Sequence, residues 1–226
     1  MPERKTVARL RCKQCLRPES YCVCSYVTMV AHRTRVLILQ HPEEHRHPLN
    51  TGRLAVLGLQ RADLLVGEHF PQLASILAAS SSAFLLFPGD SAQTPQPLDC
   101  YPPGESVLLI VPDGTWRKAR KILYANPLLS TLPRLSLPAG DPSRYRVRKT
   151  REPAAVSTIE AIARTLAALE PAQDFSPILR PFDALIDQQI AAMGGDVYQR
   201  NHVEPDTRAD IPTENPPNAL AKSPRA

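Results

Sequence analysis

The stretch VLLIVPDGTWRKARKILY, residues 107–124, indicates the fold class of this chain. Its first five residues are all apolar, whereas a strand with one face in water would alternate apolar and polar residues. Residues 107–111 therefore predict a strand that is buried on both faces. Residues 116–124 are a candidate helix that follows after a short turn. A buried strand followed directly by a helix is typical of a parallel sheet covered by helices.

Four further aliphatic runs have the character of buried strands. They lie at residues 36–39, 64–66, 83–87 and, as the weakest of the set, 134–137. Further candidate helices lie at residues 51–60, 73–79, 156–169 and 182–193. Because strands and helices alternate, we predict an α/β fold with a mainly parallel sheet that is flanked by helices on both sides.

Length, composition and charge exclude several classes of protein. The 226 residues, of which 43% are hydrophobic, suit one medium domain with a small appendage. No apolar run approaches the roughly 20 residues of a membrane helix, and the first residues lack the apolar core of a signal peptide, so we expect a cytoplasmic protein without membrane contact. Lys and Arg, 27 in all against 22 acids, are concentrated in residues 1–53 and 117–151. This segregation fits a face that meets a polyanion such as nucleic acid, although an ordinary solvated surface explains it equally well.

Four of the five cysteines form a compact motif, Cys-x2-Cys-x6-Cys-x-Cys. Two closely spaced thiol pairs can complete a tetrahedral shell around one metal ion, which is the requirement of a structural zinc site. Disulfides are the weaker interpretation in a reducing cytosol, and Fe–S ligation or free thiols stay open as alternatives. We therefore predict a small zinc knuckle whose ligands are Cys12, Cys15, Cys22 and Cys24.

The residues after each predicted strand are the first candidates for a site, because ligands of an open parallel sheet bind beyond the carboxyl ends of its strands. Small, polar and aromatic residues gather in Asn50-Thr51-Gly52-Arg53, Pro88-Gly89-Asp90 and Pro112-Asp113-Gly114-Thr115-Trp116. These segments have structural explanations as well, since Asn50 or Thr51 can cap a helix and Pro88-Gly89 is a common turn. We expect all three segments to lie at one end of the sheet.

Asp113 is the sharpest candidate for a catalytic residue, because it ends an apolar strand three residues before the only Trp, Trp116. A carboxylate beside a large aromatic ring can hold and deprotonate a flat heterocycle. Asp113 can equally stabilise the turn or cap the following helix, and Trp116 can be a packing residue. A metal site of His41, His45 and His47 is not expected, since two prolines interrupt the helical face that would join them.

The motifs follow one another in a distinctive order over roughly residues 12–190. After the two cysteine pairs come His41-Pro42 with Asn50-Thr51-Gly52-Arg53, Pro88-Gly89, Asp113-Gly114-Thr115-Trp116, Arg148-Lys149 and Ser157-Thr158-Ile159-Glu160-Ala161. This ordered set resembles the DTW domain family, which takes its name from the Asp-x-Thr-Trp element. The family consists of tRNA-uridine aminocarboxypropyltransferases.

The resemblance implies a fold related to the SPOUT methyltransferases, with S-adenosylmethionine bound where the C-terminal part of the sheet threads through a knot. It also implies transfer of the 3-amino-3-carboxypropyl group from this co-substrate to N3 of a tRNA uridine, with methylthioadenosine as the second product. Asp113 is then the expected catalytic base, and Glu160 a reserve base or a partner of the co-substrate's amino group. The expected co-substrate contacts are Asn50, Thr51, Gly52, Pro88, Gly89, Asp113, Gly114, Thr115, Trp116, Ser157 and Thr158.

Basic residues around these motifs are then expected to bind tRNA through its phosphates. They are Arg117, Lys118, Arg120, Lys121, Arg144, Arg146, Arg148 and Lys149, with a second contact from the basic zinc knuckle. The implied organisation is a zinc knuckle with a basic arm in residues 1–34, a DTW catalytic domain in 35–193 and a disordered tail without a catalytic role in 194–226. Two alternatives stay open: an RNA methyltransferase of the SPOUT type, and a non-catalytic zinc-knuckle protein that binds RNA.

Overall fold

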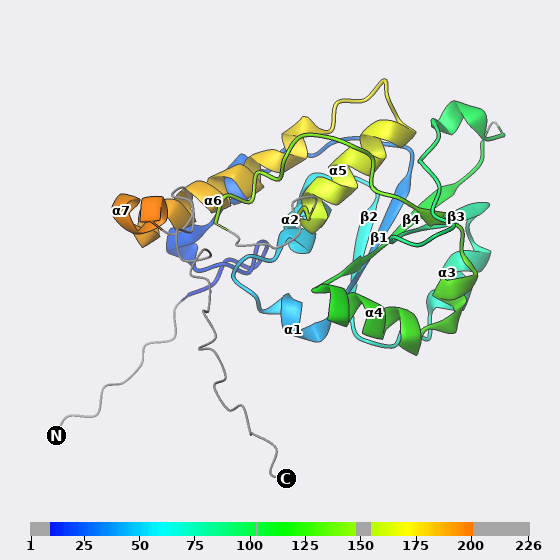
Figure 1. Cartoon of the computed structure of the whole chain (residues 1–226), viewed down its shortest axis with the longest axis horizontal. Helices are drawn as coiled ribbons and strands as arrows, with labels where there is room; N and C mark the ends of the chain where they lie inside the picture. Colours follow the sequence, from blue (N-terminus) through cyan, green and yellow to red (C-terminus); the bar gives the residue numbers. More distant parts are fainter. Residues whose placement is uncertain (1–9, 103, 148–154, 201–226) are drawn as a thin grey trace, which may run out of the picture.

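The computed structural model describes residues 10–102, 104–147 and 155–200, and its centre is one five-stranded sheet (Figure 1). The strands lie in the order β2-β1-β4-β3-β5, and every neighbouring pair is parallel. Their bounds are Arg35–Gln40 (β1), Ala62–Val66 (β2), Ser82–Leu86 (β3), Val107–Asp113 (β4) and Arg134–Leu135 (β5). The predicted α/β fold with a parallel sheet is confirmed.

The longer helices follow the predicted ranges closely. They are α2 (Thr51–Gly58), α3 (Leu73–Ala78), α4 (Trp116–Ala125), α5 (Thr158–Leu169) and α6 (Arg180–Met193). Two single-turn helices, α1 (Pro42–His45) and α7 (Gly195–Tyr198), have no counterpart in the prediction, because one turn shows no apolar periodicity. Short 3-10 helices lie at Glu19–Tyr21, Cys24–Tyr26, Leu98–Cys100, Pro127–Thr131 and Ser176–Leu179. None of the described helices is long and apolar enough to cross a membrane.

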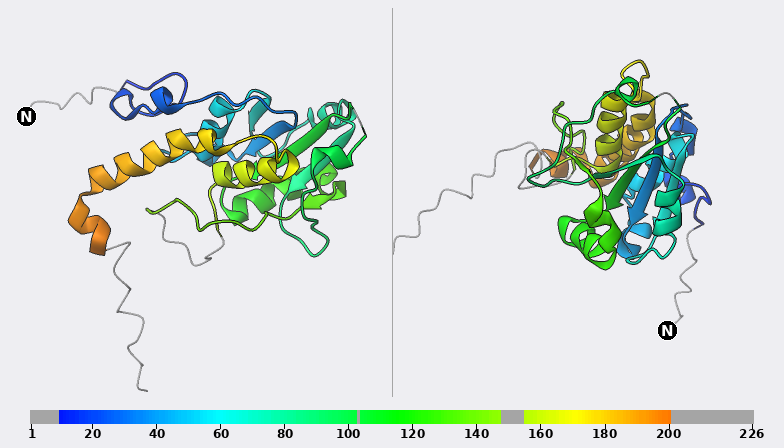
Figure 2. Two further views of the ribbon diagram at one scale, coloured as in Figure 1. Left: turned by 90° about the horizontal axis from the view of Figure 1, so that it is seen from above. Right: turned by 90° about the vertical axis from the view of Figure 1, so that its right-hand side faces the viewer.

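Alternate residues of each strand point to opposite faces of the sheet and build two separate cores. On one face, Val36 and Ile38 of β1 pack with α2, α5 and α6. On the other face, Leu37 and Leu39 of the same strand pack with α3 and α4. The ribbon views show these helices on the two sides of the sheet (Figure 1, Figure 2). Because helices cover both faces, every strand position can be apolar, which explains the uninterrupted aliphatic runs of the sequence.

The cysteine segment packs against this α/β body, and its buried residues belong to the same apolar cluster as α6. Arg17, only 6% exposed, donates to the Pro48 carbonyl at 3.0 Å and to the Gln188 side chain of α6 at 3.0 Å. Arg53 of α2 donates in turn to the Gln14 carbonyl at 2.8 Å. The cysteine segment is therefore joined to the loop before α2 as well as to α6.

The chain leaves the neighbouring strands β1 and β4 in opposite directions. From β1 it runs through α2 to β2 at one edge of the sheet, whereas from β4 it runs through α4 to β5 at the other edge. Such a divergence leaves a crevice between the two strand ends, and this is where open α/β sheets bind ligands. Gln40 at the end of β1 lies opposite Asp113 at the end of β4.

Candidate functional site

A cavity of about 600 Å³ opens at the carboxyl ends of the strands, beside the point where β1 and β4 diverge. Its wall consists of the α1–α2 loop, the ends of β3 and β4, the start of α4, the segment after β5 and the start of α5. Cavities of this size enclose small organic ligands, usually between apolar walls that carry a few polar groups. The three segments that follow β1, β3 and β4 thus line one open cavity.

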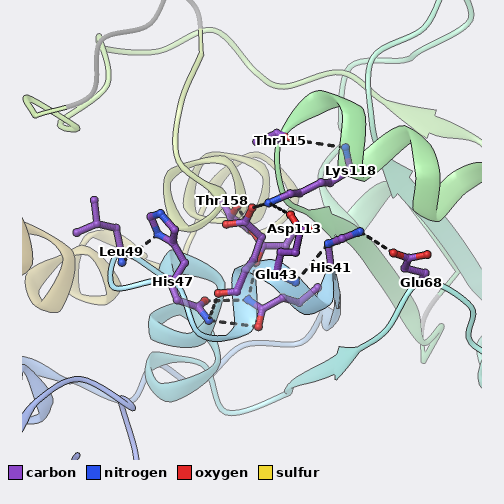
Figure 3. Close-up of polar contacts among 12 residues, drawn as sticks. His41, Glu43, His47, Leu49, Glu68, Asp113, Thr115, Lys118 and Thr158 are labelled. Atoms are coloured by element: carbon purple, nitrogen blue, oxygen red, sulfur yellow. Dashed lines mark hydrogen bonds and ion pairs between the residues drawn. The ribbon is translucent and has the colours of Figure 1, made fainter. Parts of the chain in front are cut away.

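Asp113, the last residue of β4, lines this cavity and is held by two donors (Figure 3). Gln40 Nε2 donates to Asp113 Oδ2 at 2.7 Å, and the Thr158 hydroxyl donates to Oδ1. Burial raises the pKa of the Asp113 carboxyl, and the two hydrogen bonds lower it only in part. A buried carboxylate with a raised pKa accepts a proton more readily than one in water.

Gln40 and Asn50 connect Asp113 to the loop between α1 and α2. Gln40 Nε2 also donates to Asn50 Oδ1 at 2.8 Å, and Asn50 Nδ2 returns a hydrogen bond to Gln40 Oε1 at 3.2 Å. Asn50 is the N-cap of α2, because its Oδ1 accepts from the Arg53 amide at 2.9 Å, and Nδ2 donates to the carbonyl of Glu44 at 3.1 Å. The predicted capping role of Asn50 is confirmed, and its amide also aims the Gln40 side chain.

Two glycines are required by the backbone around Asp113. A Cβ on Gly52 would lie 2.6 Å from Asp113 Oδ2, so only glycine lets the first turn of α2 approach the carboxylate. Gly114 has a φ of +153°, which L side chains rarely adopt, and a Cβ there would lie 3.0 Å from Cβ of Lys118. Gly52 therefore allows α2 to pack directly against the Asp113 carboxylate, while Gly114 allows the turn from β4 into α4.

Thr115 and Trp116 begin α4 at the mouth of the cavity. The Thr115 side chain is the N-cap and accepts from the Lys118 amide at 3.4 Å. The Trp116 ring packs edge-to-face on Phe87, with 5.7 Å between the ring centroids, and still leaves 49% of the residue exposed. Both rings line the cavity, so a flat ligand can reach the open part of the indole.

Glu160 lies in the first turn of α5, but it is 3% exposed and does not line the cavity. It forms a capping box with Ser157, whose amide and hydroxyl donate to Glu160 Oε2 at 2.8 and 2.7 Å. The Ser143 hydroxyl donates to the same oxygen at 2.8 Å, and the Arg144 amide donates to Oε1 at 2.6 Å. The carboxylate thus ties the segment after β5 to the start of α5, and both of its oxygens are occupied.

Most of the predicted co-substrate contacts line the cavity, while a few do not. The lining residues among them are Asn50, Thr51, Pro88, Asp113, Gly114, Thr115, Trp116, Ser157 and Thr158. Gly52 lies behind Asp113, and Gly89 faces the side chain of Arg134, whose Nη1 would lie 2.7 Å from an added Cβ. Two residues of the site were not among the predicted ones. Gln40 has only one signal in the sequence, a polar residue at the end of an apolar run, and Tyr145 is an aromatic of the cavity wall without a local motif.

Ion pairs join α1 to α4 beside the cavity (Figure 3). Lys118 Nζ lies 2.9 Å from Glu43 and 2.7 Å from Glu44, which holds α1 against the start of α4. His41 caps α1 through Nδ1, and its Nε2 lies 2.9 Å from Glu68 Oε1. Within the described residues, the only group of His, Cys, Asp and Glu side chains able to hold a metal ion is formed by cysteines, whereas His41 caps α1 and contacts Glu68.

The predicted RNA-binding residues fall into three groups. Lys118 pairs with acids of α1, Lys121 with Glu68 at 2.7 Å, Arg144 with Asp183 at 2.8 Å and Arg146 with Asp187 at 2.5 Å. In the described part of the chain Arg117 and Arg120 are exposed and have no ion pair. Arg148 and Lys149 lie outside the described residues.

The four cysteines of the N-terminal motif come together around one centre. All four sulfur atoms lie within 4.8 Å of one another, with 3.6 Å between Cys12 and Cys24 and 3.8 Å between Cys15 and Cys22. A tetrahedron with Zn–S bonds of about 2.3 Å has edges of about 3.8 Å, so these sulfurs fit a zinc ion. The amides of Cys15 and Gln14 donate to the Cys12 sulfur and lower its pKa to about 6, whereas burial raises the pKa of Cys24, so the case for a metal rests on the geometry of the four sulfurs. The cluster can therefore hold one metal ion.

Comparison with known families gives one match that spans most of the chain. The model of the DTW domain matches residues 9–190, which includes the cysteine motif, the whole sheet and the cavity. No solved structure matches the chain.

Curated relatives share this extent. The chain is 29% identical over 202 residues to tRNA-uridine aminocarboxypropyltransferase 2 of Macaca fascicularis, an overlap of 84% of this chain and 67% of the relative. It is 31% identical to the Drosophila melanogaster protein of the same name, over 80% of this chain and 76% of the relative. It is 28% identical to tRNA-uridine aminocarboxypropyltransferase A of Arabidopsis thaliana, over 71% of this chain and 72% of the relative.

Proposed function

The chain belongs to the DTW domain family, and on this premise we propose that it transfers the 3-amino-3-carboxypropyl group of S-adenosylmethionine to N3 of a tRNA uridine. The relatives carry the name of this activity, and they cover most of the chain. The observation that carries the proposal is the buried carboxylate of Asp113 on the wall of a 600 Å³ cavity. The carboxylate can act as a base in this cavity, which has room for the co-substrate and a uracil ring.

Asp113 is the proposed general base. Uracil N3 carries a weakly acidic proton, and Asp113 takes it as N3 forms its bond to the methylene carbon of the donated group. The bond between that carbon and the sulfonium sulfur breaks, its electron pair stays on sulfur, and methylthioadenosine leaves as a neutral thioether. Gln40 and Thr158 each hold one carboxylate oxygen, so the remaining lone pairs keep a fixed direction toward the cavity.

The chain's contribution to product choice is geometric. A sulfonium activates three carbons, so the product depends on which of them is held about 3 to 3.5 Å from the nucleophile and in line with the leaving sulfur. We assign the placement of S-adenosylmethionine to Asn50, Thr51, Ser157 and Thr158, because they bring polar groups to an otherwise mostly apolar wall. Trp116 offers a ring face to adenine or to the extruded uracil.

We propose a different role for Glu160, as the anchor of the segment that closes the cavity. Its four hydrogen bonds to Ser143, Arg144 and Ser157 support this assignment, since a base needs a free oxygen that faces the substrate. Tyr145 follows directly in that segment and lines the cavity. Glu160 thus acts on the site through the position of the cavity wall.

The remaining assignments follow from the family and are supported by local geometry. The four-cysteine cluster fits a structural zinc ion, and tRNA is the proposed macromolecular substrate. The boundary of the catalytic domain at residue 35 and a cytoplasmic location stay predictions. The proposed SPOUT-like knot involves the path from β5 to α5, of which residues 148–154 lie outside the described structure, as do residues 201–226 of the predicted tail.

Product analysis tests the proposal directly. Purified protein is incubated with tRNA and S-adenosylmethionine, and the nucleosides and the small-molecule product are weighed. Aminocarboxypropyl-uridine with methylthioadenosine is the expected pair. A methylated nucleoside with S-adenosylhomocysteine would identify a methyltransferase instead. RNA binding without any S-adenosylmethionine binding would identify a non-catalytic protein.

A further inference from the structure

A second hollow, of about 480 Å³, opens on the outer face of α4 next to the first cavity. It is lined by His41, Glu43, Arg117, Lys118, Arg120, Lys121 and Tyr124. Lys118 lines both hollows, so the two are neighbours that share the wall formed by this residue. Four of its seven lining residues are basic and one is acidic, which suits a ligand with negative charge.

The residues of this hollow come largely from one face of α4. Arg117, Arg120 and Tyr124 stand at positions i, i+3 and i+7, which align along one side of a helix. The opposite side carries the buried Ala119 and Ile122, which pack α4 against the sheet. The exposed stripe of Arg117, Arg120 and Tyr124 therefore takes no part in packing α4 against the sheet.

The cations of the stripe are not equivalent. Lys118 and Lys121 are neutralised by acids of α1 and by Glu68, as described above. By contrast, Arg117 and Arg120 are exposed and form no hydrogen bond or ion pair through their side chains in the described part of the chain. An arginine without a protein partner can place its whole guanidinium fork on a phosphate group.

Tyr124 ends the stripe and is 90% exposed, with no side-chain hydrogen bond within the described residues. A ring that stands this far from the protein contributes nothing to the core. A ring face beside two arginines is the combination with which proteins hold unpaired nucleotides, because bases stack on the ring and arginines bind the phosphates.

We propose that this face of α4 binds the RNA strand beside the target uridine, with Arg117 and Arg120 on its phosphates and Tyr124 stacked on an unpaired neighbouring base. The inference rests on the proposed function, which puts the target uridine in the first cavity. Trp116 and Tyr124 are eight residues apart, which is about 12 Å along the helix axis. The base on Tyr124 is therefore a neighbour of the target in the strand, and α4 directs the strand toward Asp113.

The arginines are tested by the salt dependence of tRNA binding. Arg117→Gln and Arg120→Gln each weaken binding. The negative slope of the logarithm of the binding constant against the logarithm of salt concentration becomes less steep by about 1 for each variant. Arg180→Gln, on α6 at the opposite face of the sheet, is the matched control and keeps the wild-type slope. Circular dichroism and affinity for S-adenosylmethionine are expected to be unchanged in all three variants.

The ring is tested by a pair of substitutions. Tyr124→Ala raises the KM for tRNA about tenfold and leaves kcat at saturating tRNA near wild type, because stacking contributes to RNA binding and not to the transfer. Tyr124→Phe keeps the ring face and restores the wild-type KM. An equal loss in both variants would show that the hydroxyl matters rather than stacking, and would overturn this part of the inference.

The outcomes separate the inference from the proposed function. If wild-type protein forms the product while the arginine variants and Tyr124→Ala bind tRNA like Arg180→Gln, the inference is wrong and the proposed function stands. A partner of another kind, such as an acidic protein, would then be the occupant of this face. If wild-type protein forms no product, the proposed function is wrong, and direct tRNA binding by the same variants still decides whether α4 contacts RNA.

Discussion

Gln40 and Asp113 occupy opposite positions at the ends of the adjacent parallel strands β1 and β4, and the Gln40 amide donates to the Asp113 carboxylate at 2.7 Å. The contact exists because the sheet order makes these two strands neighbours although the two residues are 73 positions apart in the chain. It places a hydrogen-bond donor beside a buried acid at the point where the connections diverge. Changes to either residue are therefore expected to alter the chemistry of the cavity before they alter the fold.

Asp113→Asn removes the proposed base and keeps its shape. The side-chain oxygen of the variant can still accept from Gln40, and its amide nitrogen can donate to the Thr158 hydroxyl, so the fold and the affinity for S-adenosylmethionine are retained. Product formation falls by a factor of about 10² to 10⁴, the usual contribution of a general base. Mass spectrometry of the nucleosides measures it, with the exposed Asp63→Asn as a control of unchanged activity. Turnover at the wild-type rate in Asp113→Asn would remove this residue from the mechanism.

Gln40→Met removes the amide that donates a hydrogen bond to Asp113, while the side-chain volume stays nearly the same. Because burial already raises the pKa of Asp113 and the Gln40 hydrogen bond opposes this, the pKa rises further in the variant. The acid limb of the pH profile of kcat/KM moves upward by about one pH unit, and activity returns toward wild type at higher pH. A loss that is the same at every pH would mean that Gln40 acts only on the structure.

The same shift makes folding depend on pH in a defined direction. The pKa of Asp113 is higher in the folded than in the unfolded chain, so its contribution to stability is complete below the unfolded value and is lost as the pH rises through the folded value. Asp113→Asn lacks this loss. As the pH rises, the free energy of unfolding of the variant is thus expected to increase relative to that of wild type. Urea unfolding at several pH values measures this difference. A difference that stays constant with pH would contradict the raised pKa.

Gly52→Ala forces the first turn of α2 away from Asp113, because the new Cβ would lie 2.6 Å from Oδ2. The cost of such overpacking is about 1 to 3 kcal/mol, and product formation falls together with stability. Gly195→Ala is the control, since no atom lies within 4 Å of its added Cβ. Thermal unfolding and the product assay measure the two effects. Wild-type behaviour of Gly52→Ala would show that the approach of α2 to Asp113 is not required.

Cys12→Ser removes one of the four ligands of the proposed zinc site. Wild-type protein is expected to contain about one zinc ion per chain by elemental analysis, and the variant to contain less. Because the cysteine segment shares the core with α6, the midpoint of thermal unfolding falls by roughly 5 to 10 °C. Cys100→Ser, which alters an exposed thiol outside the motif, keeps the zinc and the midpoint. Wild-type protein without bound metal would contradict the assignment.

The fold could be predicted because its signals are local. Uninterrupted apolar runs such as residues 107–111 predict strands covered on both faces. Apolar periodicity and capping residues predict the ends of the longer helices. The single turn α1 (Pro42–His45) has no such periodicity. Gln40 was not recognised because its role depends on the order of the strands in the sheet, which no local pattern encodes.

The sequence does not show which charged side chains of the site are paired and which are free to bind a ligand. The sequence presents Arg117 and Lys118 as equal members of one basic block, yet Lys118 is paired with Glu43 and Glu44, which lie far earlier in the chain, while Arg117 is exposed. The family resemblance likewise implies a place for Glu160 beside the co-substrate, whereas its contacts come from residues 143 and 144 and from the N-cap Ser157. Tertiary partners decide which charges are available, so only the structure separates them.

Arg17 reaches from the cysteine segment to the carbonyl of Pro48, two residues before Asn50, which in turn holds Gln40 and through it Asp113. The cysteine segment therefore supports the loop that positions the Asp113 carboxylate. A truncated enzyme that starts at residue 35 would keep every strand of the sheet but lose this support. Replacing the N-terminal segment with that of a distant relative is therefore expected to lower activity wherever the contact between Arg17 and the Pro48 carbonyl is lost.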